Sequence, residues 1–230
     1  MSNSPPIHFD EDMAKRYDER NSKFAPISDC LHFLTRLVLD KLPAKAHVLC
    51  VGVGTGAELL MLAQARPEWT FVGVDPSLPM VEVCRQRAAK AGIADRCELV
   101  QGYVQDLSAK AEFDAALSFL VAHFVPRAER IGFIQNMTKR LRPGGHLVTA
   151  EISYDLDSNE YPAMLENWTS MQGLTGGNAE SLASLPKILK ETLSVLSPSE
   201  TERIWREAGI TCPIRFFQAL MIHGWHGKKA

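Results

Sequence analysis

The sequence lacks the features that define several common classes of protein. No apolar run approaches the roughly 20 residues that cross a membrane, and no basic segment followed by an apolar core opens the chain. Charge of one sign is not in excess, because 25 basic and 27 acidic residues leave a formal net charge of −2. We therefore expect a soluble cytoplasmic protein without a membrane partner. A nucleic-acid partner is disfavoured but stays open, since this composition permits a local basic patch.

Cysteine is sparse and unpatterned. The five cysteines show no paired spacing of the kind found in zinc sites or disulfide frameworks: Cys30, Cys50, Cys84, Cys97 and Cys212. His223 and His226 are three residues apart, but they fall in a predicted strand with Gly224 between them, which makes a poor metal site. We expect reduced core thiols and no metal.

The stretch from His47 to Glu58 is the most informative one present. A short apolar run ends in three closely spaced glycines, Gly52, Gly54 and Gly56, and a helical pattern follows at once. Glycine permits positive φ and lets another molecule approach the backbone, and the first amides of a helix point at such a molecule. The pattern predicts strand, tight turn and helix. It favours a ligand at the turn, with a purely structural turn as the alternative.

An acid follows the glycines after roughly 20 residues, the spacing typical of nucleotide-binding sheets. The apolar run 70–75 ends in Asp75, which places a carboxylate at the carboxyl end of the next predicted strand, where it can accept the hydroxyls of a ribose. The alternative is that Asp75 caps the helix that starts near Ser77, although Ser77 can fill that role itself.

Strand and helix patterns alternate through the middle of the chain. Strands are expected at 47–52, 70–75, 97–101, 113–119 and 145–152, and helices at 57–65, 78–91 and 127–141. This order predicts an α/β fold with a doubly wound, mostly parallel sheet. Helical segments are also expected at 10–20, 27–40, 153–197 and 197–209, followed by two last strands that begin at 214 and 219.

Five motifs in this order resemble those of class I S-adenosylmethionine-dependent methyltransferases. They are the glycine turn, Val74-Asp-Pro-Ser-Leu-Pro-Met80, Gly102-Tyr-Val-Gln-Asp106, Phe113-Asp-Ala-Ala-Leu-Ser118 and Leu141-Arg-Pro-Gly-Gly145. Segments near the two ends look similar to the branch of carboxy-S-adenosylmethionine synthase and related small-molecule methyltransferases; they are 17–20, 23–26, 207–210 and 216–219. The resemblance implies a seven-stranded Rossmann-like methyltransferase fold with an antiparallel final strand, N-terminal helices and a helical insertion after strand five.

The resemblance also implies one methyltransferase domain over 1–230, S-adenosyl-L-methionine as cofactor and S-adenosyl-L-homocysteine as product. Its parts would be a lid over 1–42, a cofactor-binding core over 43–152, a helical substrate cover over 153–197, and a closing helix with two strands over 198–230. The residues implied to contact the cofactor are Tyr17, Arg20, Gly52, Val53, Gly54, Gly56, Asp75, Pro76, Met80, Tyr103, Val104, Asp106 and Ser118. Tyr17 and Arg20 have a solvated helix face as their alternative. The sequence departs from the family's pattern at Cys50 and Tyr103, where acids are common, so adenine recognition is expected from the Val104 amide or from Asp106.

Methyl transfer from a sulfonium depends mainly on positioning, so no catalytic triad is expected. His123, just beyond the fourth predicted strand, and Glu151, near the end of the fifth, are the candidates for proton removal. Their alternatives are a histidine at the core edge and an ion pair with a lid residue. Tyr154, Tyr161 and Trp168 are the candidate walls of an acceptor site, with core packing as the alternative.

The sequence therefore predicts a methyltransferase that acts on a small-molecule acceptor, and it leaves a homodimer open. Carboxy-S-adenosylmethionine synthesis is ranked lower, because no arginine occurs between Arg142 and Arg203 to anchor an extra carboxylate, and Lys187 and Lys190 are the only cations of the insertion. A tRNA-modification enzyme and a non-catalytic cofactor-binding regulator stay open. A nicotinamide-dependent oxidoreductase shares the glycines and the acid, but it does not account for the 141–145 motif.

Overall fold

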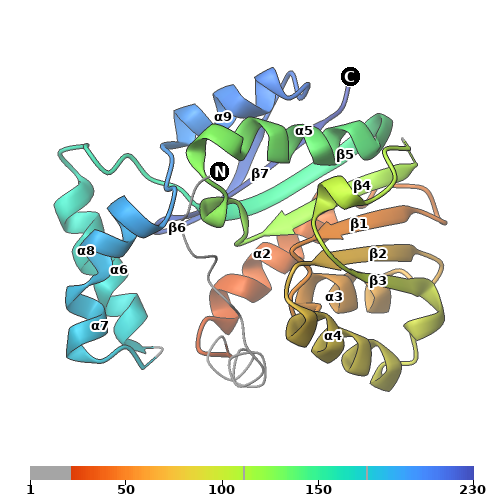
Figure 1. Cartoon of the computed structure of the whole chain (residues 1–230), viewed down its shortest axis with the longest axis horizontal. Helices are drawn as coiled ribbons and strands as arrows, with labels where there is room; N and C mark the ends of the chain where they lie inside the picture. The colour runs from red at the N-terminus through yellow and green to blue at the C-terminus, as the bar shows by residue number, and fades with distance from the viewer. Residues whose placement is uncertain (1–21, 111, 175) are drawn as a thin grey trace.

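The computed structural model describes residues 22–110, 112–174 and 176–230, and a seven-stranded sheet organises them (Figure 1). The strands are β1 His47–Val51, β2 Thr70–Asp75, β3 Cys97–Gln101, β4 Phe113–Phe119, β5 Leu141–Ile152, β6 Ile214–Ala219 and β7 Ile222–Lys228. Their order is β3-β2-β1-β4-β5-β7-β6, and β7 runs antiparallel to both of its neighbours while the other pairs are parallel. The predicted α/β, doubly wound, mostly parallel fold is confirmed.

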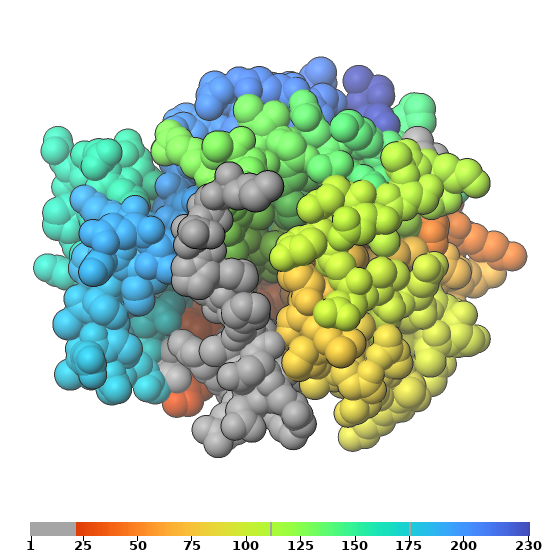
Figure 2. All heavy atoms as spheres, viewed as in Figure 1, coloured from red at the N-terminus to blue at the C-terminus, as the bar shows by residue number. Residues whose placement is uncertain are grey.

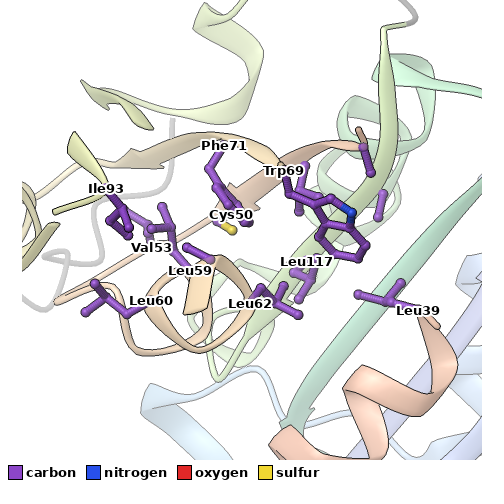
Figure 3. Close-up of a cluster of buried hydrophobic side chains, with 14 of the residues drawn as sticks. Leu39, Cys50, Val53, Leu59, Leu60, Leu62, Trp69, Phe71, Ile93 and Leu117 are labelled. Carbon is purple, nitrogen blue, oxygen red and sulfur yellow. The ribbon is translucent and has the colours of Figure 1, made fainter. Parts of the chain in front are cut away.

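Helices cover both faces of this sheet. On one face lie α2 Ala25–Val38, α3 Ala57–Ala65 and α4 Leu78–Lys90, and on the other lie α5 Arg130–Arg140 and α9 Pro198–Glu207 (Figure 1). Covered faces explain why β1, β2 and β4 are almost continuously apolar, as strands buried on both sides must be. The first core cluster joins the sheet to α3 and α4 through residues that include Cys50, Leu59 and Leu117 (Figure 3). The second core cluster joins the sheet to α5 and α9.

Local signals set several helix starts as expected. The Ser77 hydroxyl accepts a hydrogen bond from the Met80 amide and begins α4. Ser197 and Glu200 form the predicted capping box of α9, and Gly209 follows that helix with a φ of +96°.

No helix in the described part of the chain is long and apolar enough to cross a membrane.

The starts of two strands differ from the sequence-based expectation, and β1 ends one residue early, at Val51. The fifth strand begins at Leu141, which pairs with Phe113, whereas the prediction placed its start at Gly145 after a turn. The next pair is Ala115 with His146, so residues 142–145 form an excursion within the strand, with φ of +74° at Gly144. The last strand begins at Ile222 and not at residue 219, because residues 220 and 221 form the hairpin turn.

The insertion after β5 forms a helical lobe, the name used here for residues 153–197. Its elements are α6 Tyr161–Leu174, α7 Ala179–Ala183, α8 Leu185–Lys187 and the π-helical turn η5 Ile188–Thr192. The lobe lies at one end of the molecule, beside the carboxyl end of β5 (Figures 1 and 2). The lobe leaves the sheet at Ser153 and returns at Leu196, and these two residues form a parallel β-bridge. The Leu196 carbonyl accepts hydrogen bonds from the Ser153 hydroxyl at 2.8 Å and from the Tyr154 amide at 3.0 Å.

A third core cluster ties this lobe to the rest of the chain. It combines lobe residues such as Trp168 with Leu31 of α2 and with Phe217 and Met221 of the β6–β7 hairpin. Leu31 thus shares a buried cluster with the lobe, and α2 also packs against α3 and β6.

Candidate functional site

The glycine turn after β1 is held by backbone hydrogen bonds. The Val74 carbonyl accepts from the Gly52 and Val53 amides at 2.8 and 3.1 Å, and the Val53 carbonyl accepts from the Gly56 amide at 2.8 Å. All three glycines have positive φ, at +66°, +52° and +86° for Gly52, Gly54 and Gly56. This is a conformation that glycine adopts without strain.

The three glycines differ in what surrounds them. A Cβ at Gly52 would lie 2.3 Å from Cγ2 of Val121, and one at Gly56 would lie 2.5 Å from Sγ of Cys84. A Cβ at Gly54 would meet no atom of the described residues within 4 Å. Gly52 and Gly56 therefore make room for protein side chains, whereas Gly54 borders open space in which another molecule can approach the backbone.

Asp75 ends β2 directly beside this turn. One carboxylate oxygen accepts from the Gly54 amide at 2.9 Å, and the other accepts from the Ser77 amide at 2.9 Å. Burial raises the pKa of Asp75, and the two amide hydrogen bonds oppose that rise. The carboxylate thus fixes the glycine turn relative to α4, and each of its oxygens retains a lone pair for a ligand. Ser77, and not Asp75, is the cap of α4.

The loop after β3 forms the short 3-10 helix η2 Val104–Asp106. The Asp106 carboxylate accepts from the Tyr103 amide at 2.8 Å, so its first role is to cap this helix. The Val104 side chain is buried in the second core cluster, while Tyr103 is 53% exposed. The Val104 amide is the first of this short helix, so it has no acceptor within the helix.

Three further predicted contacts lie in different surroundings. Met80 is buried in α4, and Pro76 is exposed at the end of β2. Ser118 is buried near the end of β4, and its hydroxyl has no hydrogen-bond partner among the described residues. Tyr17 and Arg20 lie outside the residues that the structure describes.

His123 lies in the turn η3 Ala122–Phe124 that follows β4. It is 3% exposed, and its Nδ1 accepts a hydrogen bond from the Ile152 amide at 3.3 Å. Burial, and then the charge of Arg130, lower the pKa of His123 to about 3. A buried imidazole with so low a pKa is a weak base at neutral pH, which disfavours His123 as the candidate for proton removal and fits its alternative as a histidine of the core edge.

Glu151 lies near the end of β5, on the face that α5 covers. Its carboxylate accepts from Nη1 of Arg130 at 2.5 Å, and both side chains are almost fully buried. Burial raises the pKa of Glu151, and the adjacent guanidinium opposes the rise. Arg130 also donates to the Ser194 carbonyl at 2.7 Å. The ion pair therefore joins α5, β5 and the lobe, and the partner of Glu151 comes from α5 and not from the lid.

The aromatic residues of the lobe form part of its core. Tyr161 and Trp168 are 8% and 3% exposed and belong to the third core cluster. Tyr154 is half-buried, with its ring centroid 6.5 Å from that of Tyr161. This arrangement fits the packing alternative for Tyr161 and Trp168 better than a role as pocket walls.

The sequence did not indicate one polar pair near the glycine turn. Nε2 of His32 in α2 lies 3.2 Å from the Glu58 carboxylate in the first turn of α3. The two residues are 26 positions apart, and only the packing of α2 on α3 brings them together. No group of three or more His, Cys, Asp or Glu side chains in the described ranges is placed to hold a metal ion.

The chain is similar in sequence and in fold to known methyltransferases and to carboxy-S-adenosyl-L-methionine synthases. Residues 48–145 match the family model of the methyltransferase domain. The carboxy-S-adenosyl-L-methionine synthase of Campylobacter curvus is 26% identical over 204 residues, which cover 88% of this chain and 86% of that protein. The structure of a candidate S-adenosyl-L-methionine-dependent methyltransferase from Methanococcus maripaludis has the same fold, with a TM-score of 0.65 and 19% sequence identity. The match covers 100% of this chain and 97% of that one. The structure of a candidate O-methyltransferase from Nostoc punctiforme matches with a TM-score of 0.67 and 17% sequence identity. The match covers 90% of this chain and 58% of that one.

Proposed function

We propose that the protein is a class I S-adenosylmethionine-dependent methyltransferase that transfers a methyl group to a small-molecule acceptor. The match of residues 48–145 to the family model of the methyltransferase domain supports this. The observation that supports this most is the open space at Gly54 beside the buried carboxylate of Asp75. A ligand can approach the backbone there and meet a fixed acceptor for its hydroxyl groups.

The residues at this site suit the cofactor. Asp75 would accept the ribose hydroxyls, the turn 52–56 would lie beneath the methionine part, and Met80 and the Val104 amide would border the adenine. When bound, S-adenosylmethionine supplies a methyl group on a positively charged sulfur. The chain's contribution is to orient the acceptor and exclude water, which accounts for most of the rate in such a transfer.

Carboxy-S-adenosylmethionine synthesis is the second candidate, because the curated relatives named above include that enzyme. The lobe offers two lysines for the extra carboxylate, and both already have partners. Nζ of Lys187 lies 3.9 Å from the Glu191 carboxylate, and Nζ of Lys190 lies 5.6 Å from the ring centre of Tyr161. We therefore favour methyl transfer.

Mass spectrometry of the ligand that copurifies with the protein, followed by methyl-release assays over pools of small acceptors, tests the proposal. S-adenosylmethionine or S-adenosylhomocysteine in the purified protein and methyl release with at least one pool support it. A carboxylated form of the cofactor as the bound ligand would instead support the second candidate. A protein that binds the cofactor but transfers nothing would be a regulator.

Asp75→Ala is expected to weaken S-adenosylmethionine binding at least tenfold. Hydrogen bonds to a charged group contribute about 1.5–3 kcal/mol each, and the variant loses the ribose acceptor together with the anchor of the Gly54 amide. Calorimetry on folded protein measures the effect. Asp114→Ala is the matched control, because Asp114 is another buried aspartate that accepts a backbone amide, that of His47, but at the amino end of the strands. Equal affinities for the parent and Asp75→Ala would remove Asp75 from the site.

Gly54→Ala is expected to stay folded, at a cost of roughly 1 kcal/mol for the positive φ, and to bind S-adenosylmethionine at least tenfold more weakly. Its new methyl group would occupy the open space at the turn. Gly56→Ala is the comparison, because its methyl group would collide with Cys84 and destabilise the fold by roughly 1–3 kcal/mol more. Urea unfolding and calorimetry on both variants separate the roles, and undiminished binding by Gly54→Ala would show that the open space holds no ligand.

A further inference from the structure

His32 and Glu58 form a polar pair between two helices on the same face of the sheet. Nε2 of His32 and Oε1 of Glu58 are 3.2 Å apart, and the side chains are 17% and 25% exposed. The imidazole therefore lies beside a carboxylate, and its side chain stays partly exposed. A base whose ring is held by a third group is a recurring arrangement at sites of proton transfer.

The position of the pair is as informative as its chemistry. Glu58 lies two residues after Gly56, at the start of α3. Leu31, the residue before His32, is buried in the third core cluster together with Trp168 of the lobe. The His32 ring stacks on the ring of Phe119, the last residue of β4, with a distance of 6.5 Å between the ring centroids. His32 thus lies between the lobe and the glycine turn, where α2 runs in Figure 1. An acceptor held between the lobe and the cofactor would lie beside it.

The other described histidines are less suited to accept a proton there. Burial is the main cause that lowers the pKa of His123 to about 3, those of His146 and His223 to about 4, and that of His226. His47 begins β1 at the opposite, amino end of the strands, where its Nδ1 lies 2.8 Å from the Thr70 hydroxyl. Within residues 22–230 as described, His32 alone combines a carboxylate partner with a place near the glycine turn.

We propose that His32, oriented by Glu58, accepts the proton that the acceptor loses on methylation. This rests on the proposed function. Nε2–H donates to Glu58, so Nδ1 carries the lone pair that takes the proton of the acceptor's N–H or O–H. The acceptor's lone pair forms the new bond to the methyl carbon, and the electron pair of the broken carbon–sulfur bond stays on sulfur, which becomes neutral. The imidazolium is stabilised by Glu58 and later releases its proton to water.

The first test compares the parent with His32→Ala, Glu58→Gln and the control His47→Ala in methyl release from S-adenosylmethionine to the acceptor pool. General-base catalysis usually raises a reaction rate about 10²–10⁴-fold, so turnover by His32→Ala is expected to fall at least 100-fold. Its affinity for S-adenosylmethionine, measured by calorimetry, is expected to stay within about twofold of the parent's. Imidazole added to His32→Ala is expected to restore part of the rate. Glu58→Gln should lose about tenfold, and His47→Ala should match the parent. A structural role for His32 would show a lower melting temperature without rescue by imidazole.

The second test needs no acceptor. In ¹⁵N-histidine NMR spectra of the parent bound to S-adenosylmethionine, His32 is expected to carry its proton on Nε2 in its neutral form, and this preference is expected to weaken in Glu58→Gln. A proton on Nδ1 would overturn the inference, and so would full turnover by His32→Ala. A parent that binds no S-adenosylmethionine, or transfers nothing to any pool, would overturn the proposed function itself, so the two failures are distinguishable.

Discussion

Arg130→Ala is expected to lower the free energy of unfolding by about 3–5 kcal/mol, as is usual when one partner of a buried ion pair is removed. The variant would remove the guanidinium partner of the Glu151 carboxylate, whose side chain is 1% exposed in the parent. It would also remove the donor to the Ser194 carbonyl, which ties the end of the lobe to α5. Urea unfolding measures the loss.

Two comparisons test that reasoning. Arg203→Ala removes an arginine whose partner, Glu207, is also exposed, and such pairs contribute at most about 1 kcal/mol. The double variant Arg130→Met with Glu151→Leu removes both buried charges, so it is expected to be more stable than Arg130→Ala alone. A double variant as unstable as the single one would show that the hydrogen bond to Ser194, and not the unpaired carboxylate, dominates.

Trp168→Ala is expected to lower the free energy of unfolding by about 3–5 kcal/mol, the usual range for removing a buried aromatic side chain. The side chain is 3% exposed and belongs to the third core cluster, which also contains Leu31 of α2 and Phe217 of the β6–β7 hairpin. S-adenosylmethionine affinity should stay within about twofold, because the glycine turn and Asp75 belong to other elements. Thermal melting, calorimetry and turnover per folded molecule are measured on the same preparation.

Phe33→Ala is the matched control for this variant, since Phe33 is an aromatic residue of α2 that is 51% exposed. Its loss should change stability far less than that of Trp168. If Trp168→Ala instead melts like the parent and loses tenfold or more in turnover, the indole is a wall of the acceptor site, as the sequence alone suggested, and the packing role is wrong.

Features of the fold that depend on neighbouring residues were predictable from the sequence. Four elements have their expected bounds: β2, β3, β4 and α3. Each is specified locally, because it is a run of apolar residues with turn residues directly beside it. The start of β5 was not predictable in this way. Leu141 joins the strand because it pairs with Phe113, and that pairing depends on the position of a distant segment.

The same distinction applies to the candidate site. The glycine turn and Asp75 follow from spacing along the chain, and the structure brings them within one hydrogen bond of each other. The surroundings of His123 depend on packing: its carbonyl accepts the Ser194 amide at 2.8 Å, so a residue 71 positions later in the chain helps to bury it. The partner of Glu151 is Arg130 of α5, and the partner of His32 is Glu58 of α3. Both pairs form only when distant segments pack together, so the sequence pattern does not predict them.

The bridge between Ser153 and Leu196 means that the lobe begins and ends at a single point of the sheet. Insertions and deletions between these two anchors need not shift any strand, since the ends of the segment stay together whatever its length. The lobe is therefore a module that evolution or an engineer can exchange while the glycine turn and Asp75 stay unchanged. Related chains can diverge most in this segment, and a lobe transplanted with both anchors would test how much acceptor choice moves with it.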